Sequence, residues 1–188
     1  MKPLSIVAYF DGRPGHEKQT RSILQSLADI TRTNVVCKKV STSPLTYIKN
    51  WAVYLLSSLA GPFGKNLNSS ADLIIGTGTY THLPMIQEKE ALLKIYGEGV
   101  RVVTCMSPEP FLLNKFDLCI IPAHDNIPAR ENVFVTLGPP TPVMLKKTHK
   151  PDRGLILVGG VDRKSHKWNT RTRHRPPAMY RITGHIDK

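Results

Sequence analysis

The sequence predicts an α/β domain with a doubly wound, mostly parallel sheet and helices on both faces. Short, nearly continuous apolar runs recur over residues 1–145, as in strands that are buried on both sides. Segments with helical periodicity separate these runs, and turns that contain glycine follow several of them. The 188 residues, of which 40% are hydrophobic, suffice for one such domain and an incomplete second one.

The domain begins with two strand–helix units. An apolar strand over residues 4–10 leads through a turn into a helix over about 16–31, in which apolar side chains recur on one face. The second strand covers residues 34–40. The helix that follows it covers 44–59, because Pro44 suits the first turn of a helix.

The remaining strands of the domain follow at similar spacing. A third strand over residues 72–76 leads into a helix that ends at about Tyr96. Three further apolar runs have the length and composition of buried parallel strands. They cover residues 100–106, 117–122 and 132–137.

The sequence changes character after residue 145. Residues 146–170 contain a short linker and an apolar run that ends in Gly159 and Gly160, which resembles the first strand and turn of a new α/β unit. Residues 171–188 are basic and lack apolar periodicity. We therefore expect a truncated second domain followed by a disordered tail.

The charge of the chain is unevenly distributed. The net charge is +12, but residues 1–145 hold 14 Lys and Arg against 11 Asp and Glu, whereas residues 146–188 hold 12 against 3. A protein that grips nucleic acid usually spreads its basic residues over a folded face. The distribution therefore argues against a specific nucleic-acid partner.

The cysteines and the N-terminus indicate a reducing compartment. Cys37, Cys105 and Cys119 each lie in an apolar, strand-like run without metal-ligand spacing, so we expect buried free thiols and no metal site. The first residues lack the long apolar region of a signal peptide. The sequence favours a cytoplasmic protein, either free or at the inner face of the membrane.

The turn after the first strand is the most specific local feature. Asp11, Gly12, Arg13, Gly15 and His16 lie between a strand and a helix. Backbone N–H groups at the helix start could hold an anion, with Arg13 beside it and His16 placed for proton transfer. The alternative is a tight turn in which glycine supplies unusual φ and Asp11 caps the helix.

Other candidate site residues follow later strands. Gly76 and Gly78 form a glycine turn that either faces a ligand or is a plain loop, and it lacks the third glycine of a dinucleotide fingerprint. Glu109 either meets a sugar hydroxyl or is solvated. His124 and Asp125 either contribute acid–base chemistry or belong to a surface loop, since adjacent side chains usually point apart.

Residues 47–63 form an apolar segment that is too short to span a bilayer but apolar enough to lie on one. A helix that covers a buried sheet also needs an apolar face. The segment therefore fits either peripheral membrane contact or an ordinary helix that covers a sheet.

Five groups of motifs carry a resemblance to a known family. They are DGRPGHEKQ at 11–19, IIGTG at 74–78, FDLCIIPAHD at 116–125, NV and TLG at 132–133 and 136–138, and VGG at 158–160. In order and spacing they resemble the mitochondrial-fission (elongated-mitochondria) family, whose bacterial members are often labelled predicted nucleoside-diphosphate-sugar epimerases. The resemblance covers about residues 4–168 and fades after Trp168.

That family is similar to two-domain glycosyltransferases of the GT-B type. The resemblance implies that residues 1–145 are a Rossmann-like, acceptor-side domain in which Gly12, Gly15 and His16 line the cleft. It implies that Gly159 and Gly160 begin a donor domain, with a nucleotide-diphospho-sugar as substrate, no cofactor and an envelope-type acceptor. The chain departs from the family at residues 107–110, where SPEP replaces a more usual Asp-Pro-Arg run.

Two functions follow as expectations. The first is the acceptor-side half of a nucleotide-sugar-dependent glycosyltransferase, with His16 as the acid–base residue, inactive as an isolated chain. The second is a non-catalytic binding or scaffold protein that contacts a partner or a membrane surface.

Overall fold

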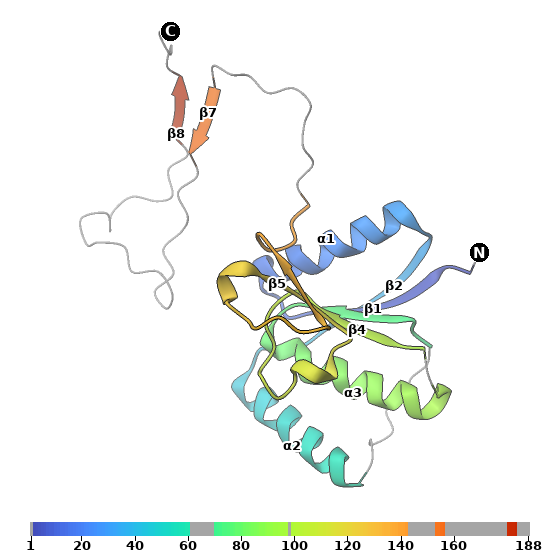
Figure 1. The fold of residues 1–188 in the computed structure, drawn as a ribbon. Helices are drawn as coiled ribbons and strands as arrows, with labels where there is room; N and C mark the ends of the chain where they lie inside the picture. The colour runs from blue at the N-terminus through green and yellow to red at the C-terminus, as the bar shows by residue number, and fades with distance from the viewer. Residues whose placement is uncertain (1, 61–69, 98, 143–152, 157–179, 184–188) are drawn as a thin grey trace. The chain divides into compact units, whose positions relative to one another are not determined.

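The structure is a computed structural model that describes residues 2–60, 70–97, 99–142, 153–156 and 180–183 (Figure 1). It divides into two compact units, Met1–Val143 and Met144–Lys188.

The first unit contains a six-stranded parallel sheet. Its strands are β1 (Leu4–Phe10), β2 (Thr33–Lys39), β3 (Leu73–Gly76), β4 (Arg101–Thr104), β5 (Leu118–Pro122) and β6 (Val133–Thr136). They lie in the order β2-β1-β3-β4-β5-β6, and every neighbouring pair is parallel. The chain adds strands on one side of β1 and then on the other, so a topological switch point lies between β1 and β3. The predicted doubly wound α/β fold is confirmed.

Helices cover both faces of this sheet. Helix α1 (Pro14–Ile30) lies on one face, and α2 (Pro44–Ala60) and α3 (Thr79–Tyr96) lie on the other (Figure 1). Helix α1 begins two residues earlier than expected, because Pro14 has the fixed φ of a first helical turn. The boundaries of the other expected elements differ by only a few residues.

Strand β1 is buried from both sides. Its residues alternate between two apolar clusters, one beneath α1 and one beneath α2 and α3. Ile6, Ala8 and Phe10 enter the first cluster, and Val7 and Tyr9 enter the second. This double burial explains the continuous apolar run in the sequence.

The cysteines only partly follow the expectation of buried free thiols. Cys105 and Cys119 are free and buried, and burial raises the pKa of their thiols to about 11 and about 12. Cys37 is exposed, so the expectation was wrong for this residue. It lies on β2, the edge strand of the sheet, which an apolar pattern does not distinguish from an interior strand.

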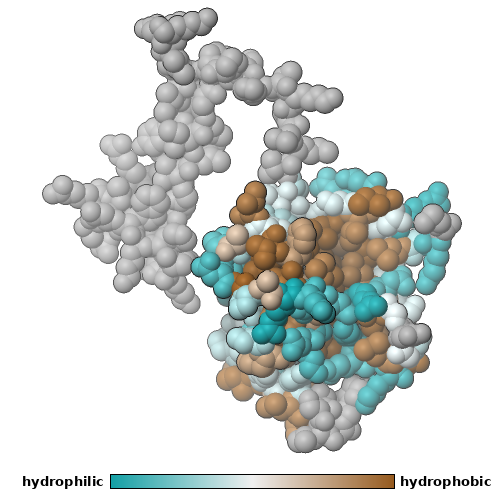
Figure 2. Space-filling model, viewed as in Figure 1, coloured by the Kyte–Doolittle hydropathy of each residue, from teal (hydrophilic) through white to brown (hydrophobic). Residues whose placement is uncertain are grey.

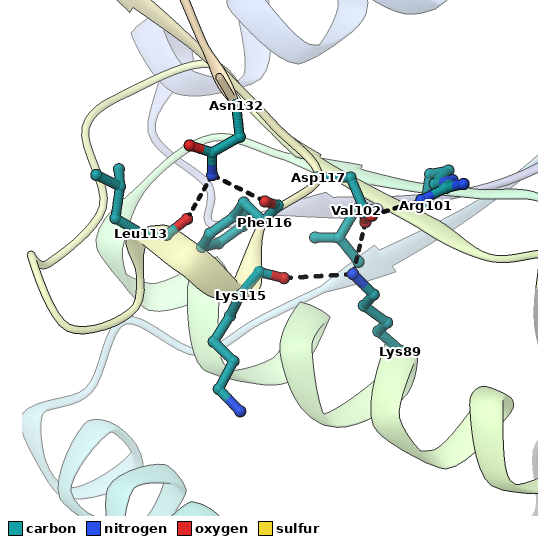
Figure 3. A network of polar contacts seen from close by, with 8 residues as sticks. All are labelled: Lys89, Arg101, Val102, Leu113, Lys115, Phe116, Asp117 and Asn132. Carbon is teal, nitrogen blue, oxygen red and sulfur yellow. Dashed lines mark hydrogen bonds and ion pairs between the residues drawn. The ribbon is translucent and has the colours of Figure 1, made fainter. Parts of the chain in front are cut away.

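A partly buried carboxylate, that of Asp117, joins strands and helix at the amino edge of the sheet (Figure 3). Asp117 Oδ2 accepts hydrogen bonds from Lys89 Nζ at 2.6 Å and from the N–H of Val102 at 2.7 Å. Its Oδ1 accepts from Arg101 Nη1 at 3.1 Å. Burial alone would raise the pKa of Asp117, but the hydrogen bonds from Lys89, Val102 and Arg101 outweigh it and hold that pKa low.

An asparagine completes this edge of the sheet. The Asn132 side-chain amide donates to the carbonyls of Leu113 at 2.8 Å and Phe116 at 3.0 Å (Figure 3). It thereby satisfies two carbonyls of the segment that precedes β5. The motif residues Asp117 and Asn132 therefore hold elements together in this domain.

The second unit contains a two-stranded antiparallel sheet of β7 (Arg153–Ile156) and β8 (Tyr180–Thr183). Tyr180–Thr183 differ from the expectation of a disordered tail over 171–188, because they pair with a strand that local sequence patterns do not connect to them. The expected strand before Gly159 and Gly160 overlaps β7. Those two glycines lie outside the described residues.

A buried polar group also connects β1, β2 and α3. Glu88 is only 7% exposed, and its carboxylate accepts hydrogen bonds from the Tyr9 hydroxyl and from Lys38 Nζ, the latter at 2.7 and 2.8 Å. Burial raises the pKa of Tyr9, and its hydrogen bond to Glu88 adds to this. The hydroxyl therefore stays protonated and donating.

We expect Glu88→Ala to lower the free energy of unfolding by about 2–4 kcal/mol, because it leaves the buried Tyr9 hydroxyl and Lys38 without their acceptor. Urea denaturation measures this. Glu90→Ala is the matched control on the same helix, since its exposed pair with Lys115 contributes about 1 kcal/mol or less. Equal losses in the two variants would contradict the structural role of Glu88.

Candidate functional site

The turns after β1 and β3 meet at the switch point of the sheet. Asp11 directly follows β1, and Thr77 and Gly78 directly follow β3, which pairs with β1. Ligands of open α/β sheets bind at the carboxyl edge of the strands at such a point. The structure therefore brings together the two glycine turns that the sequence analysis treats separately.

A carboxylate–imidazole pair occupies this position. Asp11 is 4% exposed, and its Oδ2 lies 2.7 Å from Nδ1 of His16 on the first turn of α1. Its Oδ1 accepts a hydrogen bond from the N–H of Arg13 at 3.0 Å. The N-cap of α1 is Arg13, without a side-chain capping bond, so Asp11 does not cap the helix. Asp11 instead orients His16.

Gly78 closes tightly over this pair. A Cβ atom on Gly78 would lie 2.4 Å from Asp11 Oδ2 and 2.5 Å from His16 Nδ1, and its φ is +113°. Only glycine fits this position, for both steric and conformational reasons. Gly78 is therefore part of the wall around the carboxylate–imidazole pair.

The other candidate glycines have different environments. A Cβ on Gly76 would lie 2.7 Å from Met85 Sδ, so this glycine permits close packing against α3. Gly12 has φ +79°, which its turn requires. A Cβ on Gly15 would meet nothing within 4 Å.

Arg13, the residue before α1, contacts an aromatic ring at the start of α3. Its guanidinium lies 5.5 Å from the ring centroid of Tyr80, which begins α3 together with Thr79. Among the described residues, no carboxylate forms an ion pair with it. The ring holds the cation in place by a cation–π contact and leaves its N–H groups for a ligand.

A hydroxyl pair lies under the site. Thr20 on α1 and Thr77 after β3 are both 1% exposed, and their Oγ1 atoms lie 2.9 Å apart. Local sequence patterns do not reveal this pair. Thr20 lies one helical turn after His16, and that spacing was the available signal.

Glu109 is held by protein groups. Its carboxylate accepts from the Tyr47 hydroxyl at 2.9 Å and lies 3.1 Å from Nδ1 of His82, whose Nε2 lies 3.3 Å from Thr104 Oγ1. Burial alone would raise the pKa of Glu109, but the hydrogen bond with His82 and the one from Tyr47 outweigh burial and lower that pKa. Glu109 is thus neither simply solvated nor free for a sugar hydroxyl.

The network around Glu109 includes two residues that sequence reasoning missed. His82 is 1% exposed on α3, and Tyr47 lies in the first turns of α2. The ring of Tyr47 also contacts Tyr80, with centroids 5.5 Å apart. The sequence signal for this network was a histidine, His82, among the apolar residues of a helix. Its partner Glu109 lies more than twenty positions away, so the pairing was not apparent.

His124 and Asp125 lie on a short turn after β5. His124 Nε2 is 3.5 Å from Asp125 Oδ1, so the two adjacent side chains approach each other rather than point apart. The His124 side chain is 70% exposed. Among the described contacts, none joins this pair to Asp11 and His16.

A shallow hollow of about 330 Å³ lies beside the first turn. It is lined by Gly12, Pro14, Glu17, Lys18, Arg21 and Pro142. Arg21 stacks over the Phe10 ring at 4.6 Å and pairs with Glu17 at 3.4 Å. The hollow extends the site along α1.

We expect Gly78→Ala to destabilise the domain by about 2–4 kcal/mol, because it strains the backbone and pushes Asp11 and His16 apart. Urea denaturation measures the loss, and the His16 NMR resonances report the displaced ring. Gly15→Ala is the control, since it meets no atom and favours the helix by up to about 1 kcal/mol. Unchanged stability of the Gly78→Ala variant would show that this close approach is wrong.

We expect Glu109→Gln to lower stability by about 1 kcal/mol at neutral pH, by weakening the bonds from Tyr47 and His82. Because folding lowers the pKa of Glu109, its contribution is present above the unfolded pKa of about 4.3 and is lost as pH falls through the folded value. The gap between wild type and variant should therefore close below about pH 4. Urea titrations from pH 7 to 3 measure it.

The control for this titration is Glu131→Gln, which changes an exposed carboxylate without a described partner. It should leave stability and its pH dependence nearly unchanged. A gap between wild type and Glu109→Gln that stays constant down to pH 3 would contradict the role of the ionised Glu109.

A known protein family matches most of the chain. The sequence model of one family, mitochondrial fission ELM1, matches residues 14–176, which include α1 with His16, the turn at Gly78 and the network at Asp117. No curated protein and no solved structure matched the chain. The expected family is confirmed by this match: the chain belongs to the mitochondrial fission ELM1 family.

Proposed function

We propose that residues 1–143 are the acceptor-side domain of an enzyme that transfers a sugar from a nucleotide-diphospho-sugar, with His16 as the general base. The observation that carries this proposal is the buried Asp11 carboxylate, 2.7 Å from Nδ1 of His16 at the switch point of the sheet. The similarity of the family to GT-B glycosyltransferases supports the choice of reaction.

The chemistry requires a base at the acceptor. An acceptor hydroxyl oxygen attacks the anomeric carbon of the donor, the bond from that carbon to the diphosphate oxygen breaks, and the diphosphate leaves with the electron pair. The hydroxyl proton must go to a base. With Asp11 ionised, Nδ1 of His16 donates to it, and Nε2 is the basic nitrogen that takes the proton. Asp11 then stabilises the imidazolium.

Two further features of the site could stabilise the negative charge of the leaving diphosphate. Arg13 is held by Tyr80 beside His16 without a described carboxylate partner, so its N–H groups are available to a phosphate. The first turn of α1 adds backbone N–H groups and the positive end of its dipole. The proposed reaction therefore needs no cofactor to neutralise the leaving diphosphate. The family resemblance also implies that Gly159 and Gly160 contact the nucleotide-sugar donor, and we include this role in the proposal.

The second candidate is a non-catalytic binding protein. The exposed apolar side of α2 favours it, because a surface of this kind fits a partner or a lipid. The two candidates differ in whether a nucleoside diphosphate is released.

Because the isolated chain is expected to be inactive, the test uses a full-length homologue that carries both domains. It measures release of nucleoside diphosphate from UDP- and GDP-linked sugars, with a bacterial membrane extract as acceptor. We expect His16→Ala to slow release by about 100-fold or more and Asp11→Asn to slow it less, because general bases contribute about 10²–10⁴-fold. His124→Ala is the control, since that imidazole is exposed and lies in a separate pair. Full activity of the full-length homologue carrying His16→Ala would remove the role of His16 as base, and a full-length homologue that releases no nucleoside diphosphate would favour the binding protein.

A further inference from the structure

Helix α2 presents apolar residues on two sides. Its inner side packs Trp51 and Tyr54 against the core cluster beneath α3. Its outer side exposes Leu45 by 79%, Ile48 by 64%, Leu55 by 59% and Leu56 by 55%. Figure 2 shows hydrophobic side chains reaching the surface over α2, at the lower left of the view. A helix that only covered a sheet would need the inner side alone.

The exposed residues form one continuous stripe. Ile48, Ala52, Leu55 and Leu56 follow Leu45 at spacings of 3, 7, 10 and 11 residues, which places all of them on one side of the helix. We call these five residues the α2 stripe. Ala52 is exposed as well. Lys49, also exposed, is the one charged residue of α2.

Aromatic rings border the α2 stripe. Trp51 contacts Tyr47 and Tyr54 along the helix, with ring centroids 6.2 and 5.9 Å away. Phe111, from the segment after β4, is 63% exposed and packs on Trp51 at 5.1 Å. Aliphatic residues flanked by Trp and Tyr are typical of surfaces that lie at the boundary between headgroups and acyl chains.

The charge of the segment that contains the α2 stripe has a single sign. Between Asp29 and Asp72 the sequence contains no Asp or Glu but five Lys and Arg. Lys39 and Lys49 of this segment are exposed in the structure. An apolar stripe whose own segment carries only cations is complementary to an anionic lipid surface.

We propose that the α2 stripe docks the domain onto an anionic lipid bilayer, with its aliphatic side chains in the headgroup–acyl boundary. The helix would lie in the plane of the surface, and among the described residues no helix is both long and apolar enough to cross a membrane. This inference is independent of the proposed sugar transfer. The expected membrane segment was 47–63. The α2 stripe begins before it, at Leu45, and residues 61–63 lie outside the described residues.

The test is flotation of the full chain with vesicles of phosphatidylcholine, with or without phosphatidylglycerol. We expect the wild type to float with the anionic vesicles and less at high salt. Combined Leu45→Ser, Ile48→Ser and Leu55→Ser should lower the partition coefficient by about tenfold or more, since each buried methylene contributes to binding. Lys49→Glu, which keeps the stripe apolar, should lower it severalfold.

The matched control changes three exposed apolar residues elsewhere, Ile30→Ser, Phe134→Ser and Leu137→Ser, and should float like the wild type. The basic segment 146–188 is present in every variant, so its attraction to anionic vesicles is common to all. Equal flotation of the stripe variant and the wild type would overturn the proposal. So would a wild-type dimer in light scattering that the stripe variant abolishes without loss of vesicle binding.

A second readout follows Trp51 directly. In a Trp168→Phe background Trp51 is the only tryptophan. Brominated lipids in anionic vesicles should quench its emission in the wild-type stripe and not in the serine variant. Emission that brominated lipid leaves unchanged would place the contact elsewhere and overturn the proposal.

Discussion

The double burial of β1 is the constraint on which the rest of the first unit depends. This strand pairs with β2 on one edge and β3 on the other, and its alternate residues enter both apolar clusters. Burying five of its seven residues, Ile6–Phe10, on two faces removes much apolar surface from water at about 25 cal/mol per Å². A strand that is held in this way has its carboxyl end at a fixed position in the domain. Asp11 follows immediately and can be buried only because that place is next to His16 and the N–H of Arg13.

The turn after β3 must then fit into the space that remains. Gly76 lies beside Tyr9 and Met85, and Gly78 lies against Asp11 and His16. Two small residues therefore let β3 and α3 approach β1 closely enough to complete the sheet. The same closeness shields the Asp11–His16 contact from water and strengthens it. The same close approach of β3 to β1 is therefore needed both for packing of the sheet and for the geometry of the candidate site.

Much of this architecture could be predicted from sequence, because buried parallel strands and amphipathic helices leave local periodic signals. The strand-to-helix turn at Asp11–His16 was identified for the same reason. Contacts between distant segments were not, since local periodicity does not show them: Glu109 with His82 and Tyr47, Thr20 with Thr77, and β7 with β8. The edge position that exposes Cys37 depends on strand order, which the apolar pattern of β2 does not encode.

The two edges of the sheet use their polar groups differently. At the amino edge, Asp117 accepts from three donors and Asn132 satisfies two carbonyls, so these groups are occupied by the protein itself.

At the carboxyl edge, Asp11 is similarly occupied, but Nε2 of its partner His16 makes no described contact. The Arg13 guanidinium contacts only an aromatic ring among the described residues. Unused donors and acceptors on fixed side chains are what a ligand requires, because they bind without first being reorganised. The contrast between a satisfied edge and an available one is therefore the physical reason to place function at the ends of β1 and β3.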